Sequence, residues 1–241
     1  MTPEEFKQEL VLHGIMLSDK QMDQFEEYYE FLVTTNKAVN LTAITAKNEV
    51  YLKHFYDSII PVIEEPVFRT EAVSICDVGA GAGFPSIPMK IVFPQLKVTI
   101  VDSLNKRIKF LQELVERLNL EDIELYHARA EEFAGKKSKH RESYDCVTAR
   151  AVARMSVLTE LCLPLVKIGG HFIALKAQKA DQELFDAKKA IAVLGGEFER
   201  DIKTELPLTH DERHLLIVKK IKSTPKQYPR KVGAPARNPI G

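Results

Sequence analysis

The spacing of hydrophobic positions changes once along the chain, near Val73. Before that point apolar residues recur every three or four positions, which is typical of amphipathic helices, and capping-box sequences begin at Thr2 and Ser18. From Val73 onward short apolar runs alternate with helical stripes, a pattern that predicts a parallel sheet covered by helices on both faces. We therefore expect an α/β core over residues 66–222, preceded by a helical extension over residues 1–65.

Seven strands are expected in this core. They begin at Val73 and Leu96 and then cover residues 123–127, 144–149, 171–176, 198–206 and 214–221. The last two are separated by a polar connection, residues 207–213, which leaves no room for a helix, so they should pair antiparallel. Two glycine pairs, Gly169-Gly170 and Gly195-Gly196, follow helical stripes and predict helix ends.

Three alternating glycines follow the first strand, in the sequence Asp77-Val-Gly79-Ala-Gly81-Ala-Gly83-Phe84-Pro85. Glycine permits left-handed backbone angles and a close approach of the main chain to a ligand, so this turn predicts a cradle for a nucleotide-sized molecule. A dinucleotide-binding loop would carry glycine where Phe84 stands, and Asp77 would repel a pyrophosphate. An acid here suits a ligand with an ammonium or sulfonium group, which favours S-adenosylmethionine (SAM) over NAD. Together with the reversed last strand, the loop predicts the seven-stranded, Rossmann-like sheet of SAM-dependent methyltransferases.

Further candidate residues stand at the carboxyl ends of the other strands, where ligands of such sheets bind. Asp102 ends the second strand and is a candidate for the ribose hydroxyls; the alternative is that it caps the next helix together with Ser103. Glu131 follows the third strand and is a candidate for the adenine pocket, with a surface charge as the alternative. Arg150 and Lys176 end the fourth and fifth strands, and each is either a ligand contact or half of a structural salt bridge.

Composition limits the class of protein. Hydrophobic residues make up 45% of the chain and charged residues 28%, no apolar run approaches the roughly 20 residues that span a bilayer, and the start of the chain is acidic where a signal peptide would be basic. We therefore expect a globular protein of the cytoplasm. Its cysteines, Cys76, Cys146 and Cys162, have apolar neighbours and no metal-like spacing, so we expect reduced core residues and no metal site.

Charge is distributed unevenly although the formal net charge is zero. Residues 1–30 hold eight acids and two bases, whereas residues 219–241 hold seven bases and no acid. The basic C-terminal tail, residues 223–241, suits a phosphate-rich partner; the alternative is a solvated, disordered terminus.

The motifs resemble those of the bacterial 16S rRNA (guanine-N7) methyltransferase family, also known as glucose-inhibited division protein B. The resemblance covers nearly the whole chain and rests on Asn40-Leu41-Thr42, His54-Phe-Tyr-Asp57-Ser58, the glycine loop with Phe84-Pro85-Ser86-Ile-Pro88, Ala130-Glu131, Arg150-Ala151 and Tyr228-Pro229-Arg230-Lys231. It implies SAM as methyl donor, one guanine of small-subunit rRNA as acceptor, and contacts of Gly79, Phe84, Ala130-Glu131 and Arg150 with SAM. One position departs from the family pattern, because Val232 stands where a proline is usual, which puts the rigidity of the tail in doubt.

The resemblance and the residues agree on the chemistry. Guanine N7 carries a lone pair and loses no proton on methylation, so the site needs no general base and must chiefly align donor and acceptor. The expected cofactor contacts are Asp77, Gly79, Gly81, Phe84, Asp102, Ser103, Ala130, Glu131 and Arg150. The candidates for positioning the guanine are Asn40, His54, Arg150, Lys176 and Arg230. We expect a monomeric enzyme acting on 16S rRNA or the small ribosomal subunit; the alternatives are a noncatalytic RNA-binding or ribosome assembly factor and an NAD-binding oxidoreductase.

Overall fold

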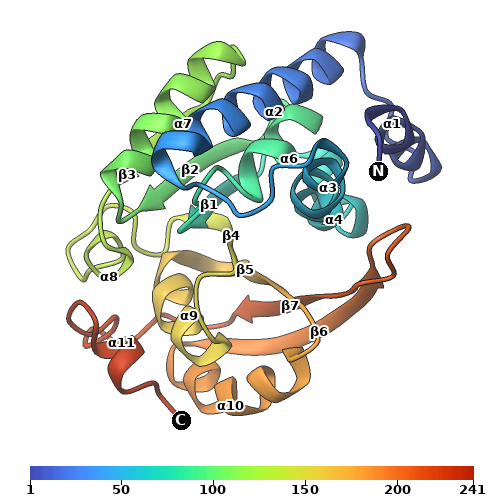
Figure 1. Ribbon diagram of the computed structural model, residues 1–241. Helices are drawn as coiled ribbons and strands as arrows, with labels where there is room; N and C mark the ends of the chain where they lie inside the picture. The colour runs from blue at the N-terminus through green and yellow to red at the C-terminus, as the bar shows by residue number, and fades with distance from the viewer.

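The computed structural model describes residues 1–241 as a twisted sheet with helices on both faces (Figure 1). The strands are β1 (Ser74–Val78), β2 (Lys97–Asp102), β3 (Ile123–His127), β4 (Tyr144–Arg150), β5 (Val166–Lys176), β6 (Gly196–Glu205) and β7 (Glu212–Lys220). The first helices are α1 (Pro3–Leu12), α2 (Asp19–Val39), α3 (Lys47–Val50), the π-helix η1 (Tyr51–Tyr56), α4 (Asp57–Glu64) and α5 (Val67–Thr70). The later helices are α6 (Ser86–Val92), α7 (Asn105–Arg117), α8 (Ala130–Phe133), α9 (Met155–Cys162), the 3-10 helix η2 (Leu163–Leu165), α10 (Ala180–Val193) and α11 (Ala234–Arg237).

The sheet has seven strands in the order β3-β2-β1-β4-β5-β7-β6. The pairs among β1 to β5 are parallel, and β7 runs antiparallel to both β5 and β6. The predicted seven-stranded sheet with a reversed last strand is therefore confirmed. Because β7 inserts between β5 and β6, the sixth strand in the sequence becomes an edge of the sheet.

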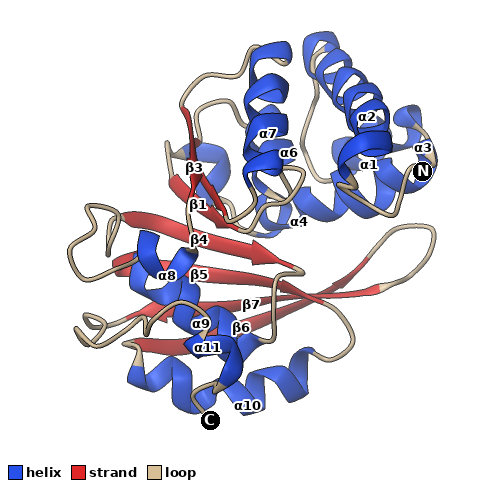
Figure 2. Ribbon diagram, turned by 60° about the vertical axis from the view of Figure 1, so that its left-hand side comes forward, coloured by secondary structure: helices blue, strands red, loops and turns tan.

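Helices cover the two faces of the sheet unequally (Figure 2). On one face α2, α4, α6 and α7 join the N-terminal helices around a core of 41 buried residues, and on the other face α9 and α10 enclose a core of 23. The N-terminal extension is thus part of the larger core, in which Phe6, Phe25 and Tyr51 form edge-to-face aromatic contacts. Both predicted capping boxes are present, at Thr2 and Ser18.

One predicted helix end is wrong. Gly169 and Gly170 lie inside β5, because the chain leaves α9 earlier through the 3-10 turn that contains Pro164. Gly169 has φ +86°, and a Cβ on Gly170 would lie 2.6 Å from the carbonyl oxygen of Asp145. The register between β4 and β5 shifts at this place, so the glycines permit an irregularity in the sheet and a close approach of two strands.

The three cysteines are buried and form no disulfide, as expected from their apolar neighbours. No helix has both the length and the apolar composition that crossing a membrane requires.

Candidate functional site

A cavity of about 730 Å³ opens beyond the carboxyl ends of β1, β2 and β4. We call it the glycine-loop pocket. Its walls come from the glycine loop (residues 79–83), the end of β2, the start of α8, the loop after β4 and the C-terminal tail. Its place matches the rule that open α/β sheets bind ligands outside the carboxyl ends of their strands, and its size is ordinary for a cofactor site.

The three positions of the loop require glycine for different structural reasons. All have positive φ, +73° at Gly79, +62° at Gly81 and +100° at Gly83. A Cβ on Gly83 would lie 2.7 Å from the Tyr28 hydroxyl oxygen, and one on Gly79 would lie 2.9 Å from the side chain of Val152. A Cβ on Gly81 would have no heavy atom within 4 Å. Gly79 and Gly83 are therefore required by packing, whereas Gly81 keeps space free at the pocket wall.

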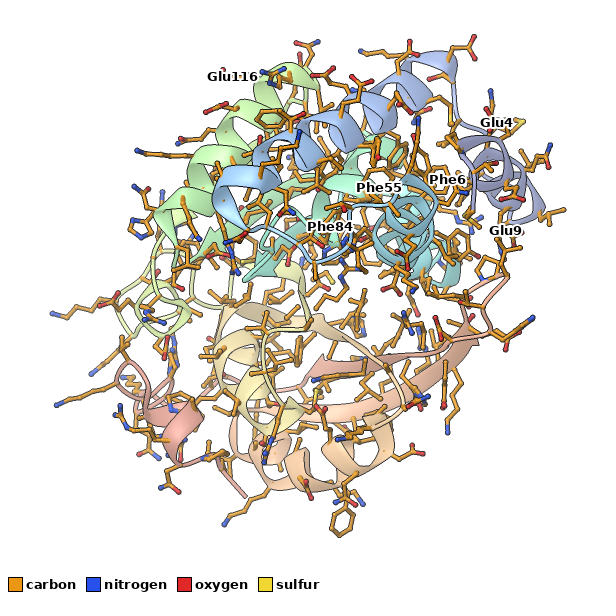
Figure 3. All side chains as sticks on the ribbon, viewed as in Figure 1. Glu4, Phe6, Glu9, Phe55, Phe84 and Glu116 are labelled. Carbon is orange, nitrogen blue, oxygen red and sulfur yellow. The ribbon has the colours of Figure 1, made fainter.

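The N-terminal extension supports this loop from behind. The Tyr28 hydroxyl on α2 donates a hydrogen bond of 2.5 Å to the carbonyl oxygen of Ala82. The Tyr28 ring also stacks on Phe84 with the ring centroids 5.5 Å apart, and Phe55 of η1 adjoins both rings. In Figure 3 the labelled Phe84, Phe55 and Phe6 follow one another from the middle of the view toward α1. A residue near the start of the chain thus fixes the loop conformation.

Asp77 lies beneath the loop and not in the pocket wall. Its side chain is fully buried, and its Oδ2 accepts a hydrogen bond of 3.1 Å from the Ser86 amide at the start of α6. Burial raises the pKa of Asp77 to about 7, although the bonds from Ser86 and the charge of Arg150 act in the opposite direction. Its other oxygen, Oδ1, has no hydrogen-bond partner. In this position Asp77 joins the end of β1 to the start of α6 and supports the glycine loop indirectly.

Asp102 links the end of β2 to the glycine loop and to the residue that precedes α7. Its Oδ1 accepts a hydrogen bond of 2.9 Å from the Leu104 amide, and its Oδ2 lies 3.2 Å from the Gly81 amide nitrogen and 3.4 Å from Nη1 of Arg107. It also lines the pocket, where only 3% of its surface is exposed. Ser103 lines the pocket too. No side chain caps the first turn of α7, so the alternative in which Asp102 and Ser103 cap this helix is wrong. The bond to the Gly81 amide nevertheless places Asp102 where it fixes the position of Gly81.

Arg150 stands at the centre of an ion network beside the pocket. Its Nη1 donates to Oδ2 of Asp57 at 3.0 Å and to the Lys53 carbonyl oxygen at 3.1 Å, and its guanidinium lies 5.0 Å from the Phe84 ring centroid. Arg213 of β7 donates to the other oxygen of Asp57 at 2.8 Å. Asp57 therefore holds two arginines from different strands, a role that the sequence did not reveal because these residues are far apart in the chain.

His54 of η1 lies between this network and the glycine loop. Its ring stacks on Phe84 with the centroids 4.6 Å apart, and its Nε2 lies 2.7 Å from Oγ1 of Thr42. Burial and the nearby charge of Arg150 lower the pKa of His54 to about 3. The imidazole is therefore neutral at ordinary pH.

The C-terminal tail forms part of the pocket wall. Residues 232, 233 and 235–237 line the pocket, and the Gly233 amide donates a hydrogen bond of 2.9 Å to Oε1 of Glu131 at the start of α8. Arg141 fastens the tail farther back by donating to the Tyr228 carbonyl oxygen at 2.8 Å. Glu131, Ala130 and the tail thus border the same side of the pocket.

Arg230 does not face solvent as an unpaired charge. Its guanidinium donates to both oxygens of Glu160, with the shortest bond 2.6 Å, and only 1% of the Glu160 side chain is exposed. Pro235 of α11 is buried as well. The tail therefore packs against α9 and is not the solvated terminus of the alternative. No feature of the sequence links Glu160 to Arg230, since 70 residues separate them.

The remaining candidates separate into two groups. Lys176 donates to the Ala153 carbonyl oxygen at 2.8 Å and to Oε2 of Glu183 at 2.6 Å, so it lies beside the loop after β4 with His54 and Arg150. Asn40 is the exposed left-handed cap at the end of α2, with φ 52°, and lines neither this pocket nor the neighbouring one. Three of the five positioning candidates are therefore brought together, while Asn40 and Arg230 lie elsewhere.

Comparisons with known proteins agree with this architecture. The sequence model of the rRNA small subunit methyltransferase G family matches residues 21–215. The protein named ribosomal RNA small subunit methyltransferase G of Ligilactobacillus salivarius is 69% identical over 240 residues, 100% of both chains, and that of Pediococcus pentosaceus is 62% identical over 100% of this chain and 99% of its own.

A solved structure shows the same fold at low sequence identity. A SAM-dependent O-methyltransferase from Thermotoga maritima superposes with a TM-score of 0.52 at 15% identity, over 79% of this chain and 72% of its own. The fold is thus that of SAM-dependent methyltransferases, and the findings do not support the oxidoreductase alternative. The chain belongs to the rRNA small subunit methyltransferase G family.

Proposed function

We propose that this protein transfers a methyl group from SAM to N7 of one guanine in 16S rRNA. The observation that carries the proposal is full-length similarity to proteins named for this class of reaction, combined with an open cradle at the position where the fold binds its ligand. In this role the protein works in the cytoplasm, on the small ribosomal subunit or a precursor of it.

The glycine-loop pocket suits the cofactor. Gly81 leaves space for a ligand close to the main chain, and carboxylates at two neighbouring strand ends, Asp102 and Glu131, supply acceptors for hydroxyl and amino groups. We assign Asp102 to the ribose and Ala130-Glu131 to the adenine. The chain around Gly79, Phe84 and Ser103 encloses the remainder, Asp77 supports the loop from beneath, and Arg150 holds the opposite wall through Phe84.

The chemistry requires little from side chains. When bound, SAM supplies a methyl group on a sulfonium, and the N7 lone pair forms the new C–N bond as the C–S bond breaks and its electrons return to sulfur. N7 loses no proton, so no general base is needed. His54 is consistent with this, because its pKa of about 3 makes it a weak base and its two nitrogens face Thr42 and Arg150. The contribution of the protein is to orient two reactants and exclude water.

Target RNA must present a base outside a helical stack, because a paired guanine cannot reach a pocket of this kind. Lys226 and Lys231 of the tail are exposed, and Lys231 directly precedes Val232, which lines the pocket. We assign them to the RNA backbone as phosphate contacts. Each such contact that is removed should weaken binding to all RNA sequences and reduce the salt dependence of binding.

Transfer of tritiated methyl groups tests the proposal. The protein is incubated with methyl-labelled SAM and 16S rRNA from a strain that lacks the gene, as free RNA and as small subunits, and the labelled nucleotide is identified by mass mapping. We expect label in one guanine, as 7-methylguanosine. RNA binding without transfer would instead identify a noncatalytic assembly factor, and label at another atom or base would contradict the assignment to N7.

A further inference from the structure

A second cavity, of about 630 Å³, adjoins the glycine-loop pocket. We call it the adjoining pocket. The two cavities share His54, Arg150 and residues 151–153 of the loop after β4, so this loop forms the boundary between them. A molecule in the adjoining pocket therefore lies next to a ligand of the glycine-loop pocket, with Val152, 40% exposed, at the edge.

The adjoining pocket carries an excess of positive charge. Its cations are Lys53, Arg150, Arg154, Lys176 and Arg213, and its carboxylates are Asp57 and Glu183. Both oxygens of Asp57 are bound by arginines, Arg150 and Arg213. Arg154 is exposed and has no ion-pair partner within 4 Å, so its charge is available to a phosphate.

Glu183 of α10 differs from Asp57 because one of its oxygens is free. Oε2 accepts hydrogen bonds from the Met155 amide at 2.9 Å and from Lys176 at 2.6 Å, whereas Oε1 accepts none. The side chain is 23% exposed, and Lys176 beside it is 9% exposed. Lys176 uses two of its three N–H groups, on Glu183 and on the Ala153 carbonyl oxygen. The pair therefore presents one free donor and one free acceptor side by side, partly shielded from water.

We propose that Glu183 and Lys176 recognise the acceptor guanine, an inference that rests on the proposed function. Guanine carries the O6 acceptor next to the N1–H and N2–H₂ donors, so Lys176 donates to O6 and Oε1 of Glu183 accepts from N1 and N2. Adenine has the reverse arrangement, an amino group at C6 next to an acceptor at N1, and would oppose donor to donor. This recognition leaves N7 free, because N7 lies on the other side of O6 from N1.

The same pair also positions the boundary loop. Glu183 accepts from the first amide of α9, and Lys176 binds the carbonyl oxygen of Ala153 just before that helix. Recognition of the base and placement of the boundary between the pockets thus depend on one ion pair. A test must therefore separate a loss of recognition from a loss of loop geometry.

Replacing the target guanosine by inosine makes this separation. Inosine keeps O6, N1–H and N7 but lacks the 2-amino group, so it removes one donor without changing the reacting atom. Ligated 16S rRNA with either nucleoside at the methylated position is presented in the assembly state that the wild-type protein methylates, and single-turnover rates are measured with excess enzyme. We expect wild-type protein to prefer guanosine by about 10-fold or more, as for a hydrogen bond to a charged group.

Variants at Glu183 distinguish a loss of base recognition from a loss of loop geometry. Glu183→Ala should methylate guanosine and inosine RNA at rates within about twofold of each other, because the partner of the 2-amino group is gone. Loop displacement alone would lower both rates and preserve their ratio. Glu183→Gln keeps an oxygen for Met155 and Lys176 but places an amide N–H₂ where Oε1 stood, opposite the N1–H and N2–H₂ donors of guanine. It should therefore also lose the preference for guanosine, and it provides the measurement if the alanine variant fails to fold. Asp186→Ala removes an exposed carboxylate one turn along α10 and should retain the wild-type ratio.

Two results would overturn the inference. One is a wild-type protein that methylates guanosine and inosine RNA equally, and the other is a Glu183→Ala protein that keeps the wild-type preference. A wild-type protein that methylates no RNA would refute the proposed function itself, which is a separate outcome. SAM affinity of Glu183→Ala, measured by calorimetry, reports any displacement of the boundary loop separately, because residues 151–153 also line the glycine-loop pocket.

Discussion

The two pockets at the carboxyl end of the sheet are built in different ways. One wall of the glycine-loop pocket depends on main-chain conformation within one short stretch, with three glycines at positive φ and a buried aspartate beneath them. The adjoining pocket depends on charged side chains from η1, α4, β4, the loop after β4, β5, α10 and β7. A wall made from consecutive residues tolerates little change at single positions, whereas one made from ion pairs can be altered at its contacts while the fold remains.

The C-terminal tail combines the two kinds of construction. It completes the glycine-loop pocket, yet it is held by long-range side-chain bonds, from Glu160, Glu131 and Arg141. The comparison therefore predicts that a change in the loop affects ligand binding most, and that a change in the tail acts on stability and ligand binding together.

Gly81→Val should have the largest effect. A valine side chain would enter the space that the loop leaves open and would also have to adopt φ +62°, so we expect SAM affinity to fall by more than about 100-fold. Calorimetry measures the affinity. Gly169→Val is the matched control, because its φ is +86° with equally open surroundings far from the pocket, and it should lose stability but keep SAM affinity. Unchanged affinity in a folded Gly81→Val protein would contradict the cradle assignment.

Asp102→Ala should cost less, on the order of 1.5 to 3 kcal/mol of SAM binding, as for a hydrogen bond to a charged group. Asp102→Asn keeps one oxygen for the Leu104 amide, so it separates this structural bond from the ligand contact. Affinity and the free energy of unfolding are measured for both variants. If the alanine variant loses stability and binds SAM normally, the aspartate only holds the Gly81 and Leu104 amides in place and is not a ribose ligand.

Arg230→Ala should lower the free energy of unfolding by about 2 kcal/mol, because it leaves the buried Glu160 carboxylate without its cation. The loss is smaller than for a buried carboxylate without any partner, because the backbone amide of residue 230 still donates to Glu160 at 2.8 Å. We expect SAM affinity to fall with it as the tail loosens. Lys231→Ala, an exposed neighbour, is the control and should change stability by less than about 0.5 kcal/mol. If RNA binding weakens while stability and SAM affinity stay at wild-type levels, Arg230 is an RNA contact and not a support of the tail.

The smallest expected effect is a change in the pH dependence of stability. The raised pKa of Asp77, about 7 against an ordinary 3.8, contributes stability below pH 4 that is lost as the pH rises toward 7. The lowered pKa of His54, about 3 against 6.5, contributes stability above pH 6.5 that is lost as the pH falls toward 3. Between pH 4 and 6.5, Asp77 makes stability fall with rising pH and His54 makes it rise. Relative to wild type, Asp77→Asn should make stability rise more with pH in urea titrations, and His54→Gln should make it rise less.

Much of the fold followed from the sequence because its signals are local. Periodicity located the strands and most helices, the lack of room for a helix between residues 206 and 214 predicted the reversed β7, and capping boxes located two helix starts. The glycine pair in β5 shows the limit. Gly169-Gly170 has the same sequence signal whether it ends a helix or relieves a crowded strand, and only the approach of the Asp145 carbonyl decides between them.

The glycine loop could be recognised in the sequence for the same local reason, since φ values of +62° to +100° demand glycine whatever the rest of the chain does. Tertiary structure alone decided which charges are occupied. Arg230, Arg150 and Lys176 were equally plausible RNA contacts by residue type, but their free or bound state depends on Glu160, Asp57 and Glu183, which lie 70, 93 and 7 residues away. An ion pair needs only proximity in space, so no spacing in the sequence predicts it.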